Sequence, residues 1–152
     1  MSDRLTDALR SEGGVLAELV DPAPQLPADG PARRAASGPR AAGRESEYEL
    51  LLEMIVEGSR LHYGAPRVVR TEDPDLALLV GDQLYALGLA RLAALGDLDA
   101  VRALAEAIAA LAQAHAEGQP ERGDEVWEAA ANRIGWGAAE AGPGRDVRRR
   151  SS

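Results

Sequence analysis

The stretch from Asp97 to Glu117 limits the possible folds most strongly, because its apolar residues recur at the spacing of one helix face. The residues on this face are Leu98, Val101, Leu104, Ala105, Ile108, Leu111 and Ala112. Alanine and leucine favour helix because they lose little rotamer freedom there. Aromatic residues make up only 3% of the 152-residue chain and Phe is absent, so alanine and leucine must fill the core. The sequence therefore predicts an all-α fold in one domain.

Two other segments carry helix signals of different strength. Over 46–63, Ser46 and Glu49 have the spacing of a capping box. The apolar residues of this segment fall on one stripe, formed by Tyr48, Leu51, Leu52 and Ile55. Gly58 interrupts the stripe, and close packing against another helix is its simplest explanation. A shorter helix is expected over 124–134, where Val126, Trp127 and Ile134 are the apolar residues.

A further helix is expected over 74–95, where leucines form a broad apolar face. Asp73 and Pro74 provide an N-cap and a first-turn proline, and Gly96 ends the helix. Almost nothing separates this helix from the one over 97–117, so we expect the two to pack as an antiparallel hairpin. The predicted architecture is a small antiparallel bundle of four or five helices.

The two ends of the chain are expected to add little to this bundle. Residues 1–44 combine a weak helix over 3–20 with a stretch over 21–44 that is rich in proline, glycine, alanine and arginine. Such a composition buries little apolar surface, so we expect a disordered linker. The folded domain should then cover 45–135. Glycine and arginine dominate 136–152, which we expect to be a disordered tail.

Composition excludes several classes of function. The formal net charge is −8, and an acidic surface repels nucleic acid, so no nucleic-acid partner is expected. There is no cysteine, which excludes disulfides, thiolate metal sites and a cysteine nucleophile. No apolar segment follows the N-terminus as in a signal peptide, and no uninterrupted apolar run approaches a membrane span. We therefore expect a cytoplasmic protein without a membrane span.

Residues for a catalytic or metal centre are scarce. His62 and His115 are the only histidines, and without cysteine they are poor material for a zinc site. The acidic clusters, Glu72, Asp73 and Asp75 and then Asp97 and Asp99, stand at helix starts, where acidic side chains cap backbone N–H groups. No nucleophile elbow is present, and a phosphate-binding loop would need the lysine that the chain lacks. No metal site is predicted.

The pair Gly81-Asp82 is unusual because it lies inside the apolar run of the helix over 74–95. A buried aspartate must be paired or hydrogen-bonded, since an unpartnered charge is costly to bury. A glycine before it allows another backbone or a ligand to come close. The alternative is an aspartate at the rim of the apolar face.

At this segment the sequence resembles the trans-polyprenyl diphosphate synthases. Residues 79–86, Leu-Val-Gly-Asp-Gln-Leu-Tyr-Ala, resemble the L-x-G-D-x-L-x-A helix of that family. Residues 92–108 resemble its continuation, and residues 116–119, Ala-Glu-Gly-Gln, resemble the end of the next helix. Upstream, residues 49–62 stand where the family has its E-x-x-H-x-x-S-L-x-H-D-D helix. The resemblance covers about 45–120 and implies a partial isoprenoid-synthase-like fold.

The chain departs from the family at the residues that hold metal. Active members carry two aspartate-rich motifs that bind Mg²⁺ against a diphosphate. In place of the first, residues 61–66 read Leu-His-Tyr-Gly-Ala-Pro, and the second would lie beyond Ser152. The family also has basic residues after the first motif, and Arg67 and Arg70 are at best partial counterparts of them. Because ionisation of the diphosphate needs those cations, we expect no prenyl transfer by this chain alone and Mg²⁺ only through a catalytic partner.

The pattern is most similar to the small, non-catalytic subunit of two-component heptaprenyl or hexaprenyl diphosphate synthases. That resemblance implies a catalytic synthase subunit as partner and an influence on product length, in the synthesis of isoprenoid or menaquinone side chains. The helix over 74–95 and its neighbour would form the contact. The candidate contact residues are Gly81, Asp82, Leu84, Tyr85, Leu87 and Gln119.

Other interpretations remain open. Leu84, Tyr85 and Leu87 are also explained as ordinary core residues. The whole chain is alternatively a helical adaptor or a self-associating protein without any isoprenoid role. An enzyme would have to recruit carboxylates such as Asp73, Asp75 and Asp82. The partial bundle should in each case leave one apolar face exposed, which argues for a partner.

Overall fold

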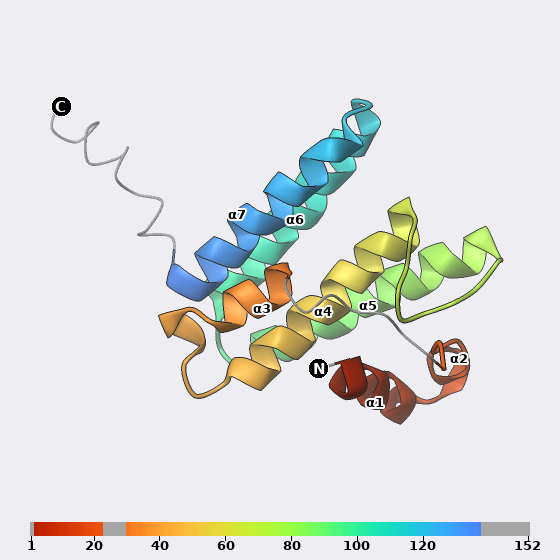
Figure 1. The fold of residues 1–152 in the computed structure, drawn as a ribbon, viewed down its shortest axis with the longest axis horizontal. Coiled ribbons are helices and arrows are strands. Elements are labelled where there is room, and N and C mark those ends of the chain that lie inside the picture. The colour runs from red at the N-terminus through yellow and green to blue at the C-terminus, as the bar shows by residue number, and fades with distance from the viewer. Residues whose placement is uncertain (1, 23–29, 138–152) are drawn as a thin grey trace, which may run out of the picture.

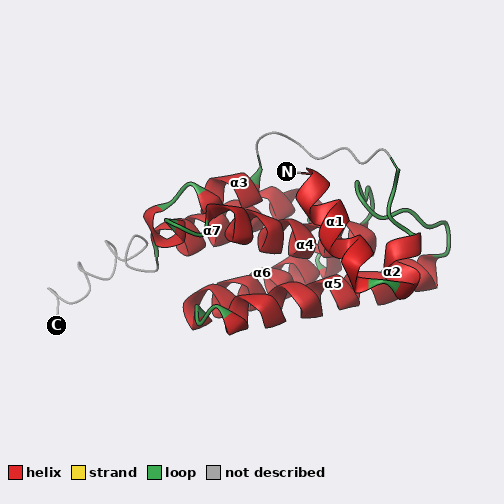
Figure 2. Ribbon diagram, turned by 90° about the horizontal axis from the view of Figure 1, so that it is seen from below, coloured by secondary structure: helices red, strands yellow, loops and turns green. Residues whose placement is uncertain are grey.

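The computed structural model describes residues 2–22 and 30–137, and these form an all-α fold, as predicted (Figure 1 and Figure 2). The α-helices are α1 (Ser2–Glu12), α2 (Gly14–Glu18), α3 (Pro31–Ala36), α4 (Glu45–Tyr63), α5 (Pro74–Ala94), α6 (Leu98–Ala116) and α7 (Gly123–Trp136). Two short 3₁₀ helices, η1 (Pro39–Ala41) and η2 (Pro120–Arg122), precede α4 and α7. The helices predicted over 46–63, 74–95, 97–117 and 124–134 are thus confirmed, with bounds that differ by one or two residues.

Helix α4 is the centre of the molecule, with α1, α3 and α5 packed around it (Figure 1). Every residue from Leu51 to Ser59 is buried, the polar ones included. The predicted capping box is wrong, because the helix starts before Ser46 and has Arg44 at the N-cap. Instead the carboxylate of Glu45 accepts a hydrogen bond from the backbone N–H of Gly43 at 3.0 Å. A carboxylate at this end also suits the helix dipole.

Glycines bring α4 and α5 unusually close together. A Cβ atom on Gly81 would lie 2.9 Å from the backbone oxygen of Gly58, and one on Gly58 would lie 2.9 Å from that of Gly81. Further along, a Cβ atom on Gly88 would lie 2.5 Å from Cγ1 of Ile55. Real Cβ atoms do not tolerate such distances, so only glycine fits. The packing explanation for Gly58 is confirmed, and Gly81 admits a neighbouring backbone.

The predicted hairpin of α5 and α6 is wrong. Helix α5 runs antiparallel to α4, and α6 pairs with α7, so the two helices meet only near their shared turn. Figure 1 shows α5 and α6 spreading apart from the turn that joins them. The face of α5 that carries the glycines packs against α4. The short link at Gly96, with a φ of 86°, then turns the chain away.

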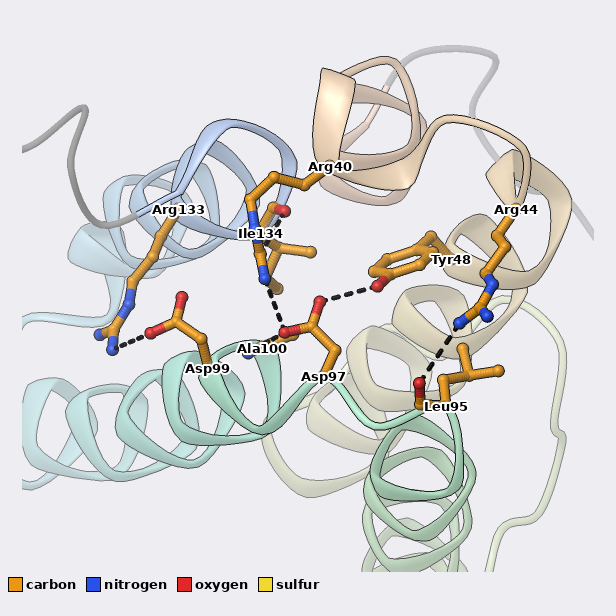
Figure 3. A network of polar contacts seen from close by, with 9 residues as sticks. All are labelled: Arg40, Arg44, Tyr48, Leu95, Asp97, Asp99, Ala100, Arg133 and Ile134. Carbon is orange, nitrogen blue, oxygen red and sulfur yellow. Dashed lines mark hydrogen bonds and ion pairs between the residues drawn. The ribbon is translucent and has the colours of Figure 1, made fainter.

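A polar network fixes the direction in which α6 leaves this turn (Figure 3). Asp97 is the N-cap, and its Oδ1 accepts hydrogen bonds from the backbone N–H of Ala100 at 3.0 Å and from Nη2 of Arg40 at 2.7 Å. Its Oδ2 accepts one from the hydroxyl of Tyr48 at 2.7 Å. Burial acts to raise the pKa of Asp97, but these three hydrogen bonds outweigh it and lower the pKa. Burial and the same carboxylate raise the pKa of Tyr48 to about 12.

The expected linker over 21–44 is folded where the structure describes it, which corrects the sequence prediction. Its alanines pack against α4 and α7, and the buried ones are Ala32, Ala35, Ala36 and Ala41. A Cβ atom on Gly38 would lie 2.3 Å from the backbone oxygen of Gly135, so η1 and α7 touch through their main chains. Prolines start α3 and η1 instead of preventing helix, because each stands in the first turn.

The N-terminal helices also belong to the folded body. Leucines of α1 and α2 are buried, namely Leu5, Leu9 and Leu16. Val20 forms an antiparallel β-bridge with Val69, and the N–H of Asp21 donates to the oxygen of Val68 at 2.6 Å. The domain boundary expected at residue 45 is therefore not a boundary of the folded part. Residues 138–152 of the expected tail lie outside the described residues.

We predict that Gly81→Ala destabilises the protein by about 1–3 kcal/mol, because the new methyl group meets the backbone of α4. The matched control is Gly123→Ala, where a Cβ atom would meet only Cδ1 of Leu111 at 3.5 Å. Urea unfolding followed by circular dichroism measures both. Equal stability of the two variants would contradict the close contact between α4 and α5.

Asp97→Asn should lower stability at pH 7 by about 1–2 kcal/mol, because it removes a charge-assisted hydrogen bond to Arg40. The pKa of Asp97 is lower in the folded state, so its stabilisation is complete above the ordinary value of 3.8 and is lost as pH falls further. The difference in unfolding free energy between the variant and the natural chain should therefore narrow as pH falls below 3.8 in urea unfolding. Asp75→Asn, at an exposed position, should show little gap at any pH.

Candidate functional site

Asp82 and Tyr85, two of the residues singled out in the sequence, meet His62 of α4. Nε2 of His62 lies 2.8 Å from Oδ1 of Asp82, and the imidazole stacks on the ring of Tyr85 with centroids 5.2 Å apart. Gly81 makes room for this, since a Cβ atom there would lie 2.8 Å from Cδ2 of His62. The Asp82 side chain is 68% exposed. It therefore stands at the rim of the apolar face, which was the alternative interpretation.

A second stacked pair extends this contact to α6. Tyr63 stacks on His115 with ring centroids 3.8 Å apart, and His62 lies 5.8 Å from Tyr63. Four rings thus run from α5 across the end of α4 to α6. Burial raises the pKa of Tyr85, with smaller effects from Tyr63 and Asp82. The sequence carries no signal that would pair either histidine with a tyrosine.

The other candidate residues are not brought into this cluster. Leu84 is completely buried and Leu87 packs against the core, so both serve as core residues. Gln119 is exposed in the turn after α6, where its side-chain oxygen accepts a hydrogen bond from Arg122 at 3.1 Å. The six predicted residues therefore do not form one site.

A cleft of about 590 Å³ lies among α3, α4, α6 and α7, next to the stacked rings. Tyr63 and His115 form part of its wall. The remaining charged and aromatic residues that line it are Arg34, Arg60, Arg67, Asp124, Trp127 and Glu128. This volume is in the usual range for small-molecule sites. No local pattern in the sequence marks the cleft, because its walls come from four separate helices.

Glu57, completely buried in α4, holds the loop at the edge of this cleft. Its carboxylate accepts hydrogen bonds from the backbone N–H groups of Arg67, Val68 and Val69 at 2.8 to 3.1 Å. Nη1 of Arg60 lies 3.1 Å from the same carboxylate. Burial lowers the pKa of Arg60 against the influence of Glu57, and the nearby charge of Arg67 lowers it further.

Glu53, one turn before Glu57, is the most unusual buried group. It is 7% exposed, and its Oε1 has no hydrogen-bond partner among the described residues. Burial raises its pKa to about 7, and the charge of Glu49 contributes. The side chain lines a small cavity of about 20 Å³ beside the cleft, together with Arg33 and Arg60. Among the described residues, no group of three His, Asp or Glu side chains could hold a metal ion.

Helix α5 carries an apolar surface that the rest of the described structure leaves open. Leu79 is 68% exposed and Leu78 is 44% exposed. The same outward stripe continues with Gln83, Ala86, Ala90 and Ala93, all exposed. By length and composition alone α5 could cross a membrane, and only 28% of its most apolar window is buried. Such a helix is weak evidence for a span, so the absence of one stays a prediction.

No protein-family model matches this chain, and no curated protein or solved structure matches it significantly.

The pKa of Glu53 implies a stability that depends on pH. The folded protein holds this proton more tightly than the unfolded chain, so the stabilisation is complete below pH 4.5 and is lost as pH rises through 7. The free energy of unfolding of Glu53→Gln should not show this loss. Relative to the natural chain, the variant should gain on the order of 3 kcal/mol of stability between pH 4.5 and 8. Urea unfolding across this pH range measures it, with Glu47→Gln, at an exposed site on α4, as control. If the unfolding free energies of the two variants change with pH in the same way, Glu53 is not the group that causes the pH dependence.

Proposed function

We propose that this chain is a non-catalytic accessory subunit of a polyprenyl diphosphate synthase of heptaprenyl type. The observation that carries the proposal is the open apolar face of α5, with Leu78 and Leu79 exposed along the most apolar helix of the described structure. Exposed apolar side chains on one helix face are a feature of protein–protein interfaces. The catalytic subunit is the proposed occupant.

The sequence resemblance supports the same helix as the contact. The Leu-Val-Gly-Asp-Gln-Leu-Tyr-Ala motif spans the middle of α5, and its glycine packs inward on α4. With that side taken, the opposite side of the helix faces outward for a partner. In this proposal the chain supplies no metal ligand, and Mg²⁺ enters only with the catalytic subunit. Its effect would be on product length in isoprenoid or menaquinone side-chain synthesis, in the cytoplasm.

A helical adaptor or self-associating protein is the second candidate. The small side chains along the outward stripe, Ala86, Ala90 and Ala93, favour it, because alanines let any apolar helix approach closely. An identical helix from a second copy would fit as well as one from a synthase. The two candidates differ in the identity of the partner and not in the surface that is used.

Co-expression with polyprenyl synthases from the same genome tests the proposal. The tagged chain should co-purify with one synthase, and the complex should make longer or more product from farnesyl and isopentenyl diphosphate than the synthase alone. Leu79→Glu should weaken the complex at least tenfold, because it places a charge in the apolar contact. The matched control is Val15→Glu, at a similarly exposed apolar position on α2, which should leave the complex intact.

Each outcome decides between the candidates. Co-purification without any change in product would exclude a role in chain length. No co-purification, together with a dimer that Leu79→Glu dissociates, would replace the accessory subunit with the self-associating protein. Equal binding by both glutamate variants would exclude α5 as the contact.

A further inference from the structure

Part of the wall of the cleft among α3, α4, α6 and α7 is apolar and suits a flat molecule. Val56, Leu111 and Trp127 line it and are each almost completely buried. The stacked rings of Tyr63 and His115 add a planar surface on one side. Ligand sites combine aromatic and aliphatic surface with polar groups that fix the orientation of the ligand, and this cleft has both. The walls come from elements that pack independently of the outer face of α5.

Three arginines are among the polar groups of the cleft, although the chain as a whole has a net charge of −8. Arg34, Arg60 and Arg67 line it, against the carboxylates of Asp124 and Glu128 on α7. The arginines come from α3, from α4 and from the loop after α4. Glu57 balances the charge of Arg60, so the feature that favours an anion is the set of guanidinium donors that Glu57 does not use.

The pair of Arg60 and Arg67 is the strongest part of this feature. Glu57 already accepts hydrogen bonds from backbone N–H groups of Arg67, Val68 and Val69, besides the one from Arg60. Through Nη1, Arg60 makes one hydrogen bond to Glu57, while a guanidinium has five N–H donors. The Arg67 side chain is exposed at the cleft, and only its backbone N–H is used by Glu57. Two neighbouring guanidinium groups with free donors match an oxyanion.

We propose that this cleft binds an organic oxyanion with a flat apolar body, such as an aromatic phosphate or carboxylate. Arg60 and Arg67 hold the oxyanion, and the body lies between Trp127 and the ring of Tyr63. The site does not depend on the proposed accessory function, because that function uses the outer face of α5.

The two tryptophans allow a direct test, since Trp127 lines the cleft and Trp136 does not. The full chain is labelled with 5-fluorotryptophan, and Trp136→Phe assigns the two ¹⁹F signals. Addition of 1-naphthyl phosphate or 1-naphthoate should shift the Trp127 signal in a saturable way and leave the Trp136 signal unchanged. The probe that binds more tightly shows whether the cleft prefers a phosphate or a carboxylate. Neutral 1-naphthol should bind at least tenfold more weakly.

The matched variants are Arg67→Gln and Arg102→Gln. Arg67 supports the fold only through its backbone N–H, so its variant should fold normally and bind the probe about tenfold more weakly. Arg102 is exposed on α6 and does not line the cleft, so its variant should bind normally. An unchanged Trp127 signal, equal binding of 1-naphthol, or equal affinity of the two variants would overturn the proposal.

Discussion

The contact between α4 and α5 through Gly58, Gly81 and Gly88 is the constraint on which the rest of the structure depends. Because the two backbones touch, α5 covers α4 along its length, and α4 becomes buried on all sides. The same contact brings His62 beside Asp82 and leaves the opposite face of α5 open. The cluster of rings and the proposed docking face are therefore two consequences of one close approach.

A helix that is buried all round should be apolar, yet α4 carries three buried glutamates, Glu49, Glu53 and Glu57. Two of them have partners: Glu49 pairs with Arg33 at 3.3 Å, and Glu57 holds the loop over 67–69. Buried charges are retained in proteins when hydrogen bonds satisfy them, as Glu57 illustrates. Glu53 has no partner for its Oε1 among the described residues, which is why burial shifts its pKa toward neutrality.

Much of the candidate site lay beyond sequence reasoning. The unusual character of Gly81 and Asp82 was visible in the sequence, because a glycine and a charge interrupt an apolar run. Their meeting with His62 was not, since no local pattern specifies which helix packs on which. Leu84 is buried in the core, whereas Tyr85 and Leu87 are partly buried and both pack against it. The cleft was hidden for the same reason, because its residues share neither spacing nor motif.

The sequence by itself determined that the chain is helical and where its longer helices lie, because propensity, caps and periodicity act within a few residues. It misjudged residues 30–44, since short alanine-rich helices are stable only when larger neighbours cover them. Only the tertiary structure decided that α5 pairs with α4 and α6 with α7. Helix pairing follows from the distances at which side chains allow backbones to approach, and for α4 and α5 the glycines at 58, 81 and 88 set that distance.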